Sequence, residues 1–97
     1  MLQNFTVTST ANSSVTIIPE QSNELLLLSL YLNGGANGGD VTITYPNGFS
    51  STFSIVAEDT ILLDTPVAMP AGSTLSFTAS AAGIKAMAST TLSLADV

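Results

Sequence analysis

Apolar and polar residues alternate with a period of two in short segments along most of the chain. Residues 5–8, 41–45 and 74–79 each place an apolar side chain at every second position, with Thr or Ser between them. A two-residue period is typical of β-strands that bury one face. Gly, Pro and Asn separate the segments, as turns between strands require. The pattern predicts an all-β chain of about eight short strands.

The longest apolar segment, residues 24–33, carries leucine on both faces, which is typical of a strand that is covered on both sides. One row is uninterrupted and is assigned to the core: Leu26, Leu28, Leu30 and Leu32. The opposite row is broken by Ser29 and is predicted to contact another subunit or a shell: Leu25, Leu27 and Tyr31. On this assignment, Leu28→Glu would unfold the chain, whereas Leu27→Glu would only prevent assembly.

The clearest hairpin of the sequence joins residues 41–45 to residues 49–57 through Pro46-Asn47-Gly48. A tight turn at this point can leave polar and aromatic side chains at its tip. Tyr45, Asn47 and Phe49 are therefore candidate residues of an exposed contact loop. Ordinary packing of the turn against the sandwich is the alternative.

Short antiparallel strands in this number fit two packed sheets, so the predicted fold is an antiparallel two-sheet β-sandwich of jelly-roll or Greek-key type. A length of 97 residues suits one domain, which we place at residues 1–97. Residues 79–88 are rich in Ala, but Gly83 and the flanking Ser and Thr argue against a helix there.

One glycine-dense stretch, residues 33–40, is similar to a single glycine-aspartate calcium repeat. Such repeats close a site only when several copies stack, so a tight turn is favoured over a calcium site. Glu58, Asp59 and Asp64 could do acid–base chemistry or bind a hard cation. No His or Arg accompanies them, so solvated turn residues are favoured instead. We predict no metal site and no cofactor.

The chain has one Lys against seven Asp and Glu, which gives a net charge of −6, and it contains no Arg, His, Cys or Trp. A single cation cannot neutralise phosphates, so nucleic acid and anionic membranes are excluded as partners. Lys85 is the only nitrogen base that could activate a Ser nucleophile, and no Gly-x-Ser-x-Gly elbow is present. We therefore expect no enzyme activity and no small-molecule substrate.

The surface is expected to be nearly uncharged, since charged residues make up only 8% of the chain and hydrophobic residues 45%. Such a composition is common where a small protein is largely covered by other protein. The first residues lack the basic and apolar regions of a signal peptide, so synthesis in the cytoplasm is expected. The longest apolar run, residues 25–28, is far too short to span a membrane.

The order of features resembles a group of small β-sandwich structural proteins from tailed bacteriophage virions. The residues that carry this resemblance are Ile18-Pro19, residues 25–33, Val41-Thr42-Ile43, residues 69–75 and residues 80–83. The resemblance extends from residue 15 to residue 94, about four fifths of the chain, and includes no catalytic signature.

This resemblance implies a non-enzymatic virion structural protein, in the first place a capsid decoration or cement protein that binds the assembled bacteriophage shell. It implies a homotrimer, with the major capsid protein or another virion protein as partner and the virion as location. A tail, neck or fibre-base component is the alternative within this class. A carbohydrate-binding β-sandwich module is the alternative outside it.

Overall fold

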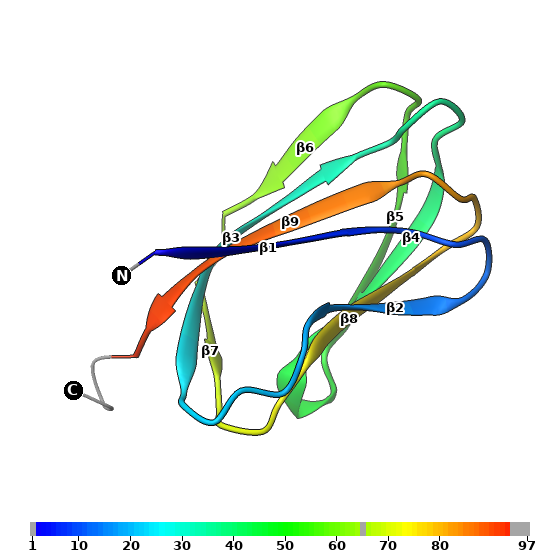
Figure 1. The fold of residues 1–97 in the computed structure, drawn as a ribbon. Coiled ribbons are helices and arrows are strands. Elements are labelled where there is room, and N and C mark those ends of the chain that lie inside the picture. The colour runs from blue at the N-terminus through cyan, green and yellow to red at the C-terminus, as the bar shows by residue number, and fades with distance from the viewer. Residues whose placement is uncertain (1, 65, 94–97) are drawn as a thin grey trace.

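The structure, a computed structural model, describes residues 2–64 and 66–93 and consists of two antiparallel β-sheets packed face to face (Figure 1). The described part contains no α-helix and one short 3-10 turn at Pro46–Gly48. It has nine strands: β1 (Gln3–Thr8), β2 (Ser14–Ile18), β3 (Leu25–Asn33), β4 (Gly39–Thr44), β5 (Ser50–Ile55), β6 (Thr60–Leu63), β7 (Val67–Met69), β8 (Leu75–Ala79) and β9 (Lys85–Leu92).

The strand order identifies the architecture. One sheet has the order β1-β9-β3-β6, with β7 also paired to β3, and the other has the order β2-β8-β4-β5. β6 pairs with Leu30–Asn33 and β7 pairs with Leu25–Leu27, so the two short strands together form one interrupted edge strand. Counted in this way, eight strands form the double-sheet jelly roll. The predicted all-β sandwich of about eight strands is confirmed.

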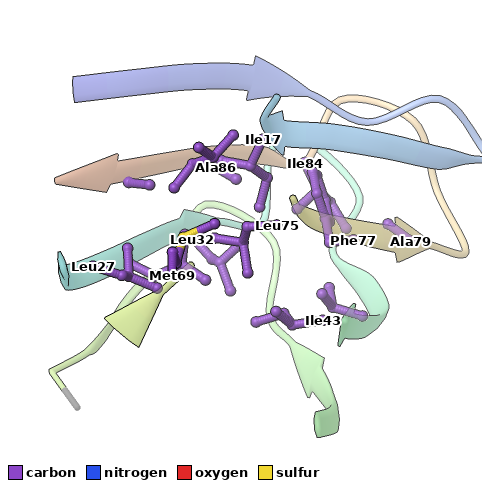
Figure 2. Packing of buried hydrophobic residues seen from close by; sticks show 14 of the residues in the cluster. Ile17, Leu27, Leu32, Ile43, Met69, Leu75, Phe77, Ala79, Ile84 and Ala86 are labelled. Carbon is purple, nitrogen blue, oxygen red and sulfur yellow. The ribbon is translucent and has the colours of Figure 1, made fainter. Parts of the chain in front are cut away.

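The core lies between the two sheets and is made mainly of aliphatic side chains that point inward from both (Figure 2). Phe77 is its one fully buried aromatic residue among those described. The members that are at most 1% exposed are Ile18, Leu30, Leu32, Val41, Ile43, Leu75, Phe77, Ala79, Ile84, Ala86 and Ala88.

The leucine-rich strand β3 does not keep a single inward row, because it contains a β-bulge. Leu27 pairs with Thr90 of β9 and Ser29 pairs with Ser89, which leaves Leu28 as an extra residue without a partner in this ladder. An extra residue reverses the phase of the side chains along the strand. Inward positions before the bulge therefore have odd numbers, and those after it have even numbers.

Two of the predicted face assignments are therefore wrong. Leu25 and Leu27, assigned to an outer contact face, are only 4% and 2% exposed and belong to the core. Leu26 and Leu28, assigned to the core, are half-buried. Beyond the bulge, Leu30 and Leu32 are buried as predicted, and Tyr31 is half-buried on the opposite face. The contact of Tyr31 with another subunit stays a prediction.

The glycine-rich loop holds one end of the sandwich together. The Gly34 amide donates to the Asp59 carbonyl at 2.9 Å, and the Glu58 amide donates to the Gly35 carbonyl at 2.7 Å. A Cβ atom added to Gly38 would lie 2.5 Å from the Ile55 carbonyl oxygen. The loop thus packs backbone against backbone, which only glycine allows at these positions.

The bulge predicts opposite effects for two adjacent leucines. Leu27→Glu should unfold the chain, because an unpaired buried charge costs several kcal/mol against a total stability of roughly 5–15 kcal/mol. Leu26→Glu should leave the fold intact, because Leu26 lies on the outer face opposite the exposed Ala68. Circular dichroism and urea titration of the two variants measure this, and equal loss of structure would contradict the bulge.

Crowding at Gly38 can be separated from backbone conformation by a matched pair of variants. Gly38 and Gly72 both have positive φ, +64° and +83°, but nothing lies within 4 Å of a Cβ on Gly72. Gly38→Ala should therefore lower the free energy of unfolding by about 1–3 kcal/mol more than Gly72→Ala. Equal losses in urea titrations would show that the close approach of residues 38 and 55 is absent.

Candidate interaction surface

An apolar groove of about 580 Å³ lies between the hairpin of β4 and β5 on one side and β6 and β7 on the other. Leu27 and Leu30, both buried, lie at its base. The remaining lining residues are Tyr45, Pro46, Asn47, Phe49, Ser51, Phe53, Leu63, Pro66, Val67 and Ala68.

The groove exists because the two sheets do not close over the core along this side. Its walls are the edge strands of different sheets, β5 in one and the β6–β7 strand in the other. Their inward residues Phe53, Leu63 and Val67 are only half-buried although they pack against the core. At the opposite side of the sandwich, β1 and β2 lie against each other. The core therefore reaches solvent along one side.

The turn between β4 and β5 forms one end of the groove. The Tyr45 amide donates to the Phe49 carbonyl at 2.8 Å and closes the hairpin. Asn47 adopts a left-handed conformation with φ of 71°, which Asn tolerates well. Tyr45 is half-buried against the core, and this burial raises the pKa of its hydroxyl. Phe49 remains 72% exposed.

The predicted contact-loop residues Tyr45, Asn47 and Phe49 are thus brought together, and all three line the groove. Their role in binding stays a prediction. The predicted interface residues of β3 are not brought together. Leu27 lies at the base of the groove and Leu25 is buried, whereas Tyr31 lies beyond the bulge, where it pairs with Met87 and Leu62.

The strand β5 presents the hydroxyl side chains of Thr52 and Ser54 to the outer face of its sheet. Thr52 Oγ1 lies 3.1 Å from Thr42 Oγ1, and the Ser54 hydroxyl donates to Asp40 Oδ1 at 2.7 Å. The alternate residues, Phe53 and the buried Ile55, consequently point inward. The alternation in the sequence predicts that Phe53 lies in a strand, but it does not predict the groove. The distance between two sheet edges depends on how the sandwich packs and not on the order of neighbouring residues.

Glu58, Asp59 and Asp64 lie in the connections on either side of β6, outside the strands. Asp59 Oδ1 accepts from the Thr60 amide at 3.1 Å, and Glu58 sits at a positive φ of 63°. No group of three or more His, Cys, Asp or Glu side chains that could hold a metal ion occurs among residues 2–64 and 66–93. Lys85 is exposed at the start of β9.

In the same described ranges, no helix is long and apolar enough to cross a membrane.

Comparisons with known proteins show the fold. No family model matches the chain, and no curated protein matches it. A solved structure of a Bacillus endospore appendage protein, from a family of disulfide-linked pili, aligns with a TM-score of 0.55 at 16% identity and covers 95% of this chain and 87% of that one. A chain of the infectious bursal disease virus Gx strain aligns at a TM-score of 0.23 and 12% identity, over 97% of this chain and 28% of that one. The second similarity is too weak to support an argument.

The scattered carboxylates predict that divalent cations have little effect. Calcium, magnesium or a chelator should move the thermal midpoint by less than a few degrees, because no closed cage of oxygen ligands is available among the described residues. Differential scanning calorimetry with and without each cation measures this. A calcium-dependent rise that saturates would indicate a site in the glycine-rich loop.

Proposed function

We propose that the protein is a non-enzymatic structural subunit that functions inside a larger protein assembly. The observation that carries this proposal is the apolar groove beside the uncharged edge strand β5. Such a surface is suited to contact with another protein and carries few reactive side chains. Apart from Tyr45, no residue that lines the groove has a titratable side chain. The jelly roll that the chain shares with a pilus protein is in keeping with such a role.

The more specific role that we propose is that of a decoration or cement protein on an assembled bacteriophage shell, which would place the chain in the virion. It rests on the sequence resemblance to virion β-sandwich proteins. Binding the lattice and not free subunits would stabilise the particle by mass action, with many weak contacts added by multivalency. The same resemblance implies a homotrimer and a major capsid protein as partner, with a tail, neck or fibre-base position as the alternative.

Copies of this chain would be held together without disulfide bonds. The endospore pili in the structural comparison are disulfide-linked, but this sequence contains no Cys. Backbone hydrogen bonds and burial of apolar surface are then the interactions available for assembly, since the chain has only one Lys and seven Asp and Glu residues to form ion pairs.

A carbohydrate-binding module is the second candidate, because three aromatic side chains, Tyr45, Phe49 and Phe53, gather along the groove. Aromatic rings can stack on sugar faces, yet the only polar side chains in the lining besides the Tyr45 hydroxyl are those of Asn47 and Ser51. A glycan array separates the two functions, since a structural subunit should bind no glycan.

Native mass spectrometry tests the structural role, with the chain alone over a range of concentrations and with purified shells. We expect self-association or shell binding, and either should vary little between about 0.05 and 0.3 M salt because few charge pairs are available to screen. A chain that stays monomeric in every mixture would contradict the structural role. A steep loss of binding with salt would indicate an electrostatic interface instead.

A further inference from the structure

The outer edge of β5 offers unpaired backbone groups in a defined pattern. β5 is the last strand of its sheet and pairs only with β4, in the register Ile43 with Ser51 and Val41 with Phe53. Because the Tyr45 amide bonds to the Phe49 carbonyl, alternation along an antiparallel ladder directs the amides and carbonyls of residues 51, 53 and 55 toward β4. Those of residues 50, 52 and 54 then point away from the sheet, where a further strand would bind them.

The edge lacks the features that normally prevent strands from pairing with one another. Charged residues, Pro and bulges protect natural edge strands. The segment from residue 41 to residue 57 contains no charged residue, and β5 itself contains no Pro and no bulge. By contrast, β7 is bracketed by Pro66 and Pro70, and β2 contains an irregularity and ends before Pro19. In a chain of net charge −6, this hairpin adds no charge of its own that would repel a second copy.

Exposed apolar residues lie at both ends of β5, with Phe49 three residues before Thr52 and Val56 four residues after it. Phe49 and Val56 are 72% and 70% exposed, and they flank the strand at its two ends. If two β5 strands pair antiparallel with Thr52 opposite Thr52, Phe49 of one copy lies opposite Ile55 of the other and next to its Val56. The same register sets Ser51 opposite Phe53 and Ser50 opposite Ser54. Aromatic with β-branched, and Thr with Thr, are favourable cross-strand pairs.

We propose that β5 is a self-association strand, which pairs with β5 of a second copy about a two-fold axis at Thr52 and joins the two sheets into one. The backbone groups of residues 50, 52 and 54 supply the ladder, and Phe49 of each copy covers the apolar end of the other. The two grooves meet along the new strand pair, so each copy shields the apolar side of its neighbour. The contact is isologous and closes at two copies.

The strand β1 also lies at a sheet edge and contains no charged residue, but it does not offer this arrangement. Its exposed apolar residue Leu2 lies at one end only, and the opposite end continues into the polar Ser9 and Thr10. Threonine at position 6 of β1 is exposed on the outer face, as is threonine at position 52 of β5. The two strands therefore provide a matched comparison within one chain.

Single-cysteine variants test the pairing, because the chain has no native Cys. Across a two-fold axis at residue 52, the two Cα atoms would be about 5.5 Å apart, which a disulfide can bridge. Thr52→Cys should form a disulfide-linked dimer under mild oxidation, and Thr6→Cys should stay monomeric on a nonreducing gel. Cross-linking of Thr6→Cys but not Thr52→Cys, or of neither, would overturn the proposal.

Charge exchange at the same position tests the register independently of oxidation. Thr52→Glu and Thr52→Lys each place like charges opposite each other and should weaken self-association by roughly fivefold. An equimolar mixture of the two variants should restore it, as measured by sedimentation velocity. Circular dichroism checks that both variants are folded, as expected for an exposed side chain. Failure of the mixture to recover would overturn the two-fold register.

This inference deepens the proposed structural function, and the two can fail separately. Oligomers or shell binding without a cross-link in the Thr52→Cys variant would leave the structural function in place and overturn β5 pairing. A wild-type dimer by native mass, together with the cross-link in that variant, supports β5 pairing over the homotrimer implied by the resemblance. A wild-type chain that is monomeric at every concentration, with no cross-link in the Thr52→Cys variant, would also overturn β5 pairing.

Discussion

Burial of the inward face of β3 against the opposite sheet is the interaction on which the rest of the structure depends. This strand is paired on both sides, with β9 along one edge and with β6 and β7 along the other, and its inward leucines reach the centre of the core. The bulge at Leu28 decides which leucines those are. The bulge lies between the part of β3 that pairs with β7 and the part that pairs with β6.

An interrupted edge strand has a consequence for the whole side of the sandwich. β6 and β7 pair with β3 and not with β5, and the buried Leu27 and Leu30 line the groove that separates these edges. A chain of this size already buries a modest share of its surface. Further association that covers the groove would thus remove apolar area from water at a place where the fold itself does not.

Local alternation was sufficient to predict the strands, the hairpin turn and the two-sheet class, because each depends on neighbouring residues. β4 and β8, for example, alternate apolar and hydroxyl residues along most of their length. It was insufficient for the phase of β3, since four consecutive leucines satisfy either face equally well. The phase is set by pairing of Leu27 with Thr90 and of Ser29 with Ser89, partners that are distant in the sequence.

The candidate surface, too, could be predicted from the sequence only in part. Tyr45, Asn47 and Phe49 are neighbours in one turn, so sequence alone could place them together. Their relation to Leu63 and Val67 depends on how far two sheet edges stand apart, which is a property of the packed sandwich. The same distinction explains why the charge-free segment 41–57 was visible in the sequence, while its meaning was not. The structure places β5 at the end of its sheet. An edge strand without charged residues lacks one of the features that prevent pairing with another strand, so this edge favours such pairing.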